Sequence, residues 1–451
     1  MTTTYVVILI YFLLIFGVAR YFSRKESLQE YFLNNKSSSL RLLVFANVAT
    51  LVWAWAVVTT VSEVYNSGIS MWLSNIISFL FWAILLALLS PQIYKFWLKH
   101  WIYNVVDFFA KRFDKKNQIL VLILQLFLLI VWTSIQIMAI ALLVSSLVWI
   151  GYYVSLLISV GITILYTSMW WLKIDIITDF IQFWIIFLVF IIMAVIWYQD
   201  VWWFHSLISQ LSPGHLNPFA FGWIWFFVWW ILFGGLVYIP NSCHRQRILS
   251  AKDESTAKKS FYRSIPFLVL LMAIVVFLWL VAAVSLPSIP QDNAIFALMK
   301  NLLSNKRLLW IWFSCILAVV MSSVDSLLVA GSTIIYRWFI KQKNVSEKKW
   351  MLRARLLTAW FGVLCMILSI VAPSLIFIWL FVMYLALIFV PAILAGMFSS
   401  KISSNASFYS LLIPSVILIA GYIPIWKNIF ILTTVLAIVI VLFYDKIFRN
   451  K

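Results

Sequence analysis

Long apolar runs separated by short polar segments extend along the whole chain. Each run has about 20 residues, which is long enough for a helix to cross a bilayer, and we count about 13 of them. The pattern therefore predicts an all-α polytopic membrane protein without a sizeable soluble domain. The first run lacks the features of a cleaved signal peptide, so we expect a retained helix. The predicted spans are 4–20, 40–62, 69–93, 118–143, 148–170, 176–198, 221–241, 264–286, 309–335, 355–372, 374–397, 407–424 and 428–444.

The ninth predicted span contains the most unusual polar cluster of the chain. A carboxylate at membrane depth is costly and usually marks a functional site, which draws attention to Asp325. Ser322, Asp325 and Ser326 share one helix face by their spacing, and Ser323 lies about 100° around the helix from Ser322. Val319, one turn earlier, can add a backbone carbonyl if the helix is locally open. Hard oxygen ligands of this kind favour a small cation.

These hydroxyls also have a structural interpretation. Serine and threonine in membrane helices commonly bond to their own helix or pack between helices. The clustering of several hydroxyls beside a carboxylate favours a site over that role. For Asp325 and Ser326 we expect a polar network, and Asp325 serves in it either as a structural hydrogen-bonding group or as a proton carrier.

Two other spans are candidates for interrupted helices. The second span carries Asn47 and Thr50 near its middle, and the seventh contains a Gly-Gly pair and Pro240. The two helices are five positions apart in the order of spans, which is an odd offset, so they run in opposite directions. Paired unusual helices in oppositely oriented halves indicate an inverted-repeat transporter. Within one transmembrane domain, 1–451, we predict an extra first helix (4–20), a first five-helix repeat (40–198), a second repeat (221–397) and additional helices (407–444).

The sixth span begins with two carboxylates one helical turn apart. We expect Asp175 at the surface near the inner end of the span, and Asp179 one turn deeper on the same face. Asp179 has two interpretations: an interfacial carboxylate favoured by the helix dipole, or a functional group inside the membrane.

Composition and charge placement support the membrane prediction. The chain is 65% hydrophobic and only 10% charged, with a formal net charge of +19, and its mean hydropathy is +1.04. If the amino terminus is outside, only four of the 33 basic residues fall in outer loops, which is a strong positive-inside pattern. The excess charge therefore indicates topology and a lipid bilayer as partner, not nucleic acid. We expect an integral plasma (bacterial inner) membrane protein with a cytoplasmic carboxyl terminus. The four outer residues are Lys300, Lys306, Arg307 and Lys427.

Catalytic and cofactor motifs are not apparent in the sequence. The three cysteines and four histidines lack metal-type spacing, and we find no Gly-rich phosphate motif. A membrane-embedded transferase would need acidic or basic catalytic clusters at the loop mouths, so we do not expect an enzyme.

Four segments carry a family resemblance. They are EYFLNNKSSSLRLLVFANVAT with EVYNSGISMW, TDFIQ at 178–182, QRILSAKD at 246–253 and SSVDSLLVAGS at 322–332. Together they resemble the sodium:solute symporters, which include sodium/proline, sodium/pantothenate and sodium/glucose carriers. The resemblance implies a leucine-transporter-type fold and a co-transported sodium ion. It also implies that Asp179 lies near the sodium pathway. The sodium ligands it implies are the carbonyls of Ala49, Val52 and Val319 and the hydroxyls of Ser322 and Ser323.

The chain departs from this family in the region expected to bind solute. Leu51 stands where proline carriers have aspartate and sugar carriers have asparagine, and Gly234 and Val237 stand at positions that are polar or aromatic in sugar carriers. A sugar is therefore disfavoured relative to a small zwitterion or carboxylate such as proline. Aromatic faces can wall such a solute, although with 26 Trp in the chain any one of them is more often a lipid-facing or packing residue. The solute-lining candidates are Trp53, Ala56, Thr59, Gly234, Tyr238 and Asn241.

The leading hypothesis is therefore secondary active transport, with sodium-coupled symport of a small organic solute. Two alternatives remain open at this point. A proton could replace sodium, with Asp325 or Asp179 as its carrier. Alternatively, the altered family segments could mark a transport-derived membrane sensor without coupled transport. The sequence names neither the solute nor an oligomeric state.

Overall fold

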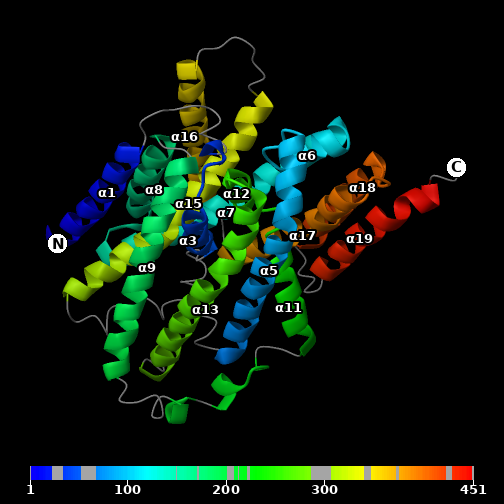
Figure 1. The fold of residues 1–451 in the computed structure, drawn as a ribbon. Coiled ribbons are helices and arrows are strands. Elements are labelled where there is room, and N and C mark those ends of the chain that lie inside the picture. Colours follow the sequence, from blue (N-terminus) through cyan, green and yellow to red (C-terminus); the bar gives the residue numbers. More distant parts are fainter. Residues whose placement is uncertain are drawn as a thin grey trace.

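The computed structural model is a bundle of helices in which each of the predicted spans contains one α-helix (Figure 1). The structure describes residues 2–22, 34–51, 68–148, 150–169, 172–200, 208–211, 213–220, 224–285, 306–339, 347–371, 375–422 and 429–448. Its helices are α1 (Thr2–Phe22), α3 (Leu40–Leu51), α5 (Ile69–Lys99), α6 (Val105–Arg112), α7 (Lys115–Val148), α8 (Tyr152–Met169), α9 (Leu172–Asp200), α11 (Ile224–Leu236), α12 (Ser242–Ser250), α13 (Glu254–Ser285), α15 (Lys306–Phe339), α16 (Glu347–Val371), α17 (Leu375–Phe398), α18 (Ser404–Tyr422) and α19 (Ile429–Phe448), with short 3₁₀ turns η1 (Asn34–Lys36) and η2 (Pro213–Leu216).

The predicted all-α polytopic class is confirmed. Among the described residues, nine helices are long and apolar enough to cross a membrane, and three shorter apolar helices accompany them. Among the same described residues, the only β-type pairing is one isolated bridge between Ser38 and Ala251. Helices satisfy their own backbone groups, which is why they are suited to a hydrocarbon environment. The number of spans that cross the membrane stays a prediction.

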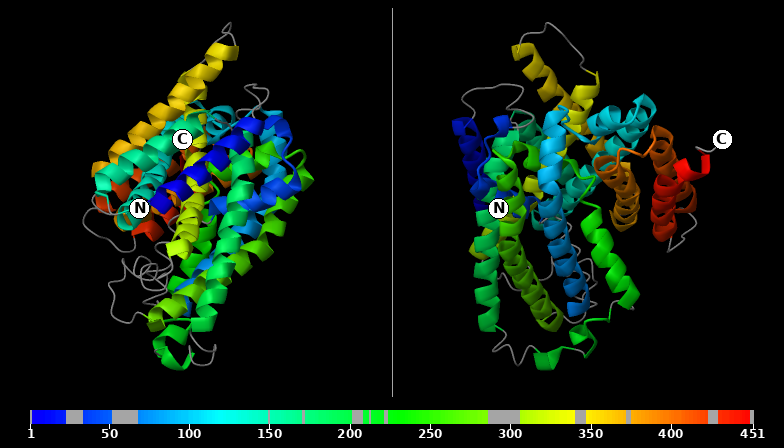
Figure 2. Two further views of the ribbon diagram at one scale, coloured as in Figure 1. Left: turned by 90° about the vertical axis from the view of Figure 1, so that its left-hand side faces the viewer. Right: turned by 45° about the vertical axis from the view of Figure 1, so that its right-hand side comes forward.

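Helix α15 lies at the centre of the bundle, whereas α18 and α19 lie at its edge. In the most apolar window of α15, 94% of the residues are buried, against 28% for α19. Helices α3, α7, α8, α9, α12 and α16 all contact α15, and Figure 1 shows it running through the middle of the bundle. In Figure 2 the α18–α19 pair stands to one side near the carboxyl terminus, and α16 extends beyond one end of the bundle. The polar cluster of the ninth span is therefore in the protein interior, not toward lipid.

The helix of the seventh predicted span is interrupted near its end. A second helix, α12, follows the interruption and lies beyond the predicted boundary at residue 241. Helix α11 ends at Leu236, residues 237–241 are non-helical, and α12 begins at Ser242. Pro240 has no backbone donor, and the side chain of Asn241 caps α12 by accepting a hydrogen bond from the Cys243 N–H at 2.9 Å. Residues 242–250 lie outside the predicted spans, yet all nine residues of α12 are buried.

The beginning of α3 is tied to the end of α12. The Ser38 N–H donates to the Ser250 carbonyl at 3.0 Å, and the two hydroxyls are also hydrogen-bonded, at 3.0 Å. Asn34 donates to the Ser38 hydroxyl at 2.8 Å from within the η1 turn. The Tyr94 hydroxyl, from α5, donates to the Ala251 carbonyl at 3.2 Å. These bonds set where the two short helices α3 and α12 meet the rest of the bundle.

Helix α6 lies between the third and fourth predicted spans. Its Arg112 donates to the carbonyls of Gly396 and Ser399, at 2.9 and 2.6 Å, which caps the end of α17. Asp107 pairs with Arg337, at the end of α15, at 2.8 Å. Burial raises the pKa of Asp107, and the Arg337 guanidinium opposes that rise. Helix α6 therefore fastens the ends of α15 and α17 at one face of the bundle (Figure 1).

Close packing of α15 against α16 gives a first testable prediction. A methyl group at Gly331 would overlap the buried Phe361 ring, whereas nothing lies within 4 Å of a methyl group at Gly161. We expect Gly331→Ala to destabilise the protein by about 1–3 kcal/mol through overpacking. Gly161→Ala, within α8, should be neutral or stabilising by up to about 1 kcal/mol. Thermal unfolding in detergent, followed by tryptophan fluorescence, measures both. Equal melting temperatures for the two variants would contradict the packing described here.

Candidate functional site

Oxygen atoms from α3 and α15 converge at the end of the described part of α3. The Ser322 hydroxyl donates to the carbonyls of Ala49 and Val319, at 3.2 and 2.9 Å, and the Ser323 hydroxyl donates to the Val319 carbonyl at 3.3 Å. All four residues are 0–1% exposed. The structure thus brings together four of the five residues predicted as sodium ligands. The fifth, Val52, lies outside the described residues. We call this set the α3–α15 oxygen cluster.

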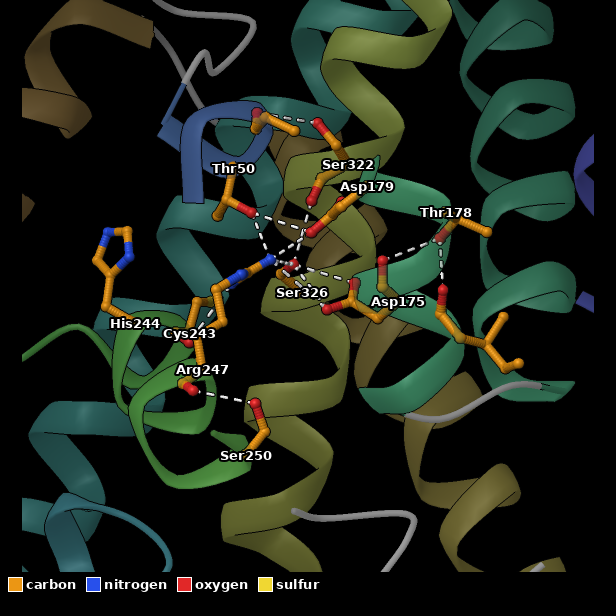
Figure 3. Close-up of polar contacts among 12 residues, drawn as sticks. Thr50, Asp175, Thr178, Asp179, Cys243, His244, Arg247, Ser250, Ser322 and Ser326 are labelled. Atoms are coloured by element: carbon orange, nitrogen blue, oxygen red, sulfur yellow. Dashed lines mark hydrogen bonds and ion pairs between the residues drawn. The ribbon is translucent and has the colours of Figure 1, made fainter. Parts of the chain in front are cut away.

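A second buried cluster lies one turn away and centres on Arg247 of α12 (Figure 3). Its Nη2 atom donates to the Thr50 hydroxyl and to Asp179 Oδ2. The same nitrogen lies 2.8 Å from the Ser326 hydroxyl and 3.6 Å from the nearest oxygen of Asp175. The side chains of Arg247 and Asp179 are 1% and 0% exposed. One guanidinium nitrogen therefore lies among oxygens from α3, α9 and α15. We call the five residues Arg247, Thr50, Asp175, Asp179 and Ser326 the Arg247 cluster.

Asp175 is buried in this cluster, which corrects its predicted place at the surface. It is 4% exposed, and the Ser326 hydroxyl donates to both of its carboxylate oxygens, at 3.0 and 3.1 Å. Asp179, on the next turn of α9, is 0% exposed and pairs with Arg247. No local pattern around Asp175 identifies Arg247, more than 60 positions away, as the cation that pairs with both carboxylates.

The two clusters share their helices. Ala49 and Thr50 are consecutive in α3, and Ser322 and Ser326 are one turn apart in α15. The Ser326 hydroxyl also lies 3.1 Å from the Ser322 carbonyl. A change in one cluster therefore reaches the other within a single helical turn.

Negative charge exceeds positive charge around these clusters. Arg247 faces the two carboxylates of Asp175 and Asp179, and the buried Asp325, which precedes Ser326 in α15, adds a third. The Thr167 hydroxyl of α8 bonds to Asp325 Oδ1 at 2.7 Å, which places Asp325 in a polar network separate from that of Ser326. Asp179 Oδ1 and Asp325 Oδ2 are buried and have no hydrogen-bond partner among the described residues. Uncompensated carboxylates inside a membrane protein favour a bound cation or proton.

The predicted solute-lining residues fall into two groups. Trp53, Ala56 and Thr59 lie outside the described residues. Gly234 packs closely against Ser78 of α5, Tyr238 lies 5.7 Å from Trp82 and 5.3 Å from His244 between ring centroids, and Asn241 caps α12. These three therefore line the interruption between α11 and α12, and their contact with a solute stays a prediction.

Sequence reasoning missed the partners that complete the site: Arg247, Thr50 and Thr167. Arg247 lies in the segment QRILSAKD, which was noted for its family resemblance but given no role. A usable signal was present, because two carboxylates one turn apart in a membrane helix require a nearby cation. Choosing Arg247 among the basic residues needed the three-dimensional structure.

Comparison with known proteins decides the family of this chain. The model of the sodium:solute symporter family matches residues 31–414. The chain belongs to the sodium:solute symporter family. A sodium/proline symporter from Staphylococcus aureus (strain Newman) is 24% identical over 361 residues, which cover 76% of this chain and 70% of that protein. Family and relatives are transporters, so this family member is an integral membrane transporter and not an enzyme.

Solved structures confirm the expected leucine-transporter-type fold for this symporter. A Na⁺-coupled sialic acid symporter in a substrate-bound outward-open state superposes with a TM-score of 0.86 at 15% identity, covering 99% of this chain and 97% of that one. A nucleobase-cation-symport-1 family transporter in a closed conformation gives 0.66 at 12% identity, covering 93% and 95%. At these identities the likeness concerns the fold alone.

The burial of Asp175 gives a prediction for this symporter. Asp175→Asn keeps the shape of the side chain but removes a charge that faces Ser326 and Arg247. We expect a loss of stability of about 1–3 kcal/mol, typical of a hydrogen bond to a charged buried group. The control is Asp253→Asn, because Asp253 accepts the Thr256 N–H at 2.6 Å as a helix cap and Asn caps equally well. Melting temperatures in detergent compare the two. An unchanged Asp175→Asn would contradict a buried ionic role.

Proposed function

We propose that this protein is a sodium-coupled symporter of a small organic solute, with sodium bound at the α3–α15 oxygen cluster. The observation that carries the proposal is the convergence of the Ala49 and Val319 carbonyls with the Ser322 and Ser323 hydroxyls. Uncharged hard oxygens are ligands that small cations accept. The excess of carboxylates nearby supplies the negative potential that would retain a monovalent cation.

Sodium would couple transport by holding α3 and α15 together. Both helices contact α12, the helix that follows the interruption, and interrupted helices commonly form the solute site of inverted-repeat transporters. A bound ion would favour the conformation that receives solute, and release of the ion would favour the opposite one. The membrane potential contributes about 2.3 kcal/mol per charge per 100 mV to this cycle.

For the solute we propose a small zwitterion or carboxylate such as proline. Two features support it: the residues that stand at the expected sugar-binding positions, Gly234 and Val237, have no polar side chain, and the sodium/proline symporters are relatives over most of the chain. The proposed solute-lining residues remain Trp53, Ala56, Thr59, Gly234, Tyr238 and Asn241. The proposed repeats remain 40–198 and 221–397.

The sodium proposal predicts a selective loss of sodium affinity in two variants. Ser322→Ala and Ser323→Ala each remove one ligand, so each should weaken sodium binding by about tenfold or more. The control is Ser332→Ala, which removes an equally buried hydroxyl of α15 that bonds to its own helix at the Val329 carbonyl. Stabilisation of the purified protein by NaCl relative to KCl, measured as a melting-temperature shift, gives the apparent affinity.

Proline counterflow in proteoliposomes extends this test to transport. We expect exchange that requires sodium and is reduced in the Ser322 and Ser323 variants. If counterflow persists without sodium but follows pH, a proton-coupled carrier replaces the sodium proposal. If sodium neither stabilises the protein nor supports flux of any small zwitterion or carboxylate, the coupled-symport proposal fails.

We further propose that the amino terminus is outside and the carboxyl terminus cytoplasmic. Helix α6 and the neighbouring ends of α15 and α16 lie at one end of the bundle, and these segments carry many basic residues (Figure 1). The positive-inside pattern predicts that this end is cytoplasmic. A membrane-impermeant thiol reagent should therefore reach Lys116→Cys only in inverted vesicles and Lys427→Cys only in intact cells. The reverse pattern would overturn the orientation.

A further inference from the structure

Arg247 occupies a position that oxygen ligands from three helices surround. Its Nη2 atom contacts Thr50 of α3, Asp179 of α9 and Ser326 of α15, and Asp175 is the next oxygen donor at 3.6 Å. Figure 3 shows the guanidinium extending from α12 into this group, while His244 points away from it. A buried side chain that bridges four helices through one charged nitrogen opposes their separation.

Arg245 of α12 stacks on the Trp97 ring of α5, 4.8 Å from its centroid, and neutral hydrogen bonds hold α12 to the other helices. At its beginning, Gln125 of α7 donates to the Ser242 hydroxyl at 3.2 Å, and in its middle Gln246 donates to Thr333 of α15 at 3.2 Å. At its end the Ser250 hydroxyl bonds to Ser38 at 3.0 Å. Neutral hydrogen bonds contribute less than charge-assisted ones. The Arg247 cluster is therefore the strongest polar attachment that keeps α12 against α3, α9 and α15.

The same attachment is adjacent to the proposed sodium ligands. Thr50 follows Ala49 directly, and Ser326 lies one turn below Ser322 and contacts its carbonyl at 3.1 Å. If α12 moves away from α9, Thr50 and Ser326 lose a partner, and the α3–α15 oxygen cluster loses support on that side. Ion occupancy and the position of α12 are thus linked through two helices.

We propose that Arg247 is a latch that holds α12 closed over the α3–α15 oxygen cluster, and that its release opens the route from that cluster along α12. The proposed latch depends on the proposed function in one respect only, which is the identity of the ion that it encloses. On release, Asp175 and Asp179 lose their guanidinium partner, and a cation leaving the oxygen cluster would meet both carboxylates. Arg247 is a positioning residue in this scheme, because it acts through α12 and not as a sodium ligand.

Native cysteines provide a direct test of the latch. Cys243 of α12 is 1% exposed, and its carbonyl accepts a bond from Arg247 Nη1 at 3.4 Å. Cys315 in α15 and Cys365 in α16 are equally buried but lie outside the latch. The purified full-length protein is reacted with a small thiosulfonate reagent, and peptide mass spectrometry gives the modification rate of each cysteine. Local opening of α12 raises only the modification rate of Cys243, whereas global unfolding raises the rates of all three cysteines.

The informative variants weaken the latch by different amounts. Arg247→Lys keeps the charge but not the geometry of the guanidinium, and we expect Cys243 to react about tenfold faster. Ser326→Ala removes one of the partners and should give about a threefold increase. It also keeps the test valid if the Arg247 variant folds poorly. Ser332→Ala is the matched control on α15 and should leave all three rates unchanged.

Each outcome distinguishes the latch from a general structural role. A selective rise at Cys243 in both variants supports the latch. The latch is overturned if the modification rates of all three cysteines rise together in these variants. It is also overturned if Cys243 in the variants reacts no faster than Cys315. NaCl in place of KCl should slow Cys243 modification in the wild-type chain. If NaCl and KCl give the same Cys243 modification rate while the variants still raise only that rate, the sodium proposal fails and the latch stands.

Discussion

The constraint on which this structure depends is the neutralisation of charge inside a membrane protein. Asp175 and Asp179 are fully enclosed by helices, and Arg247 is the guanidinium placed to pair with them. Removing one partner from a buried ion pair costs about 3–5 kcal/mol, because the other charge stays uncompensated. The position of α12, the packing of α3 and α9 against α15, and the burial of Thr50 and Ser326 all follow from satisfying these charges.

One guanidinium does not balance the carboxylates around α15, and this imbalance connects structure to function. Asp325 is a further buried carboxylate, with only the Thr167 hydroxyl as a described partner. The uncharged oxygens of Ala49, Val319, Ser322 and Ser323 lie next to this excess negative charge. A family of sodium-coupled carriers would use such an arrangement to bind a cation weakly enough to release it. The ion, the solute and the latch in our account are separate proposals built on this shared charge distribution.

Much of the fold was predictable because bilayer-spanning helices leave a strong pattern in the sequence. Each predicted span contains a helix, and the polar residues singled out on the ninth span are buried in the structure. The sequence failed at α12, because a run with two arginines and a histidine resembles a solvated loop. Its burial depends on carboxylates more than 60 positions away, which no local pattern reveals. Asp175 was misplaced for the same reason. The roles of the candidate ligands and solute-lining residues follow from family resemblance and stay predictions.

The central claim is that the α3–α15 oxygen cluster binds sodium, and isotopic sodium binding to the purified protein tests it most directly. We predict saturable binding of ²²Na⁺ that excess unlabelled sodium displaces and potassium does not. We also predict its loss in the Ser322→Ala/Ser323→Ala double variant, with normal binding in Ser332→Ala. Saturable binding that survives the double variant, or an absence of saturable binding to the folded wild-type protein, would contradict the account.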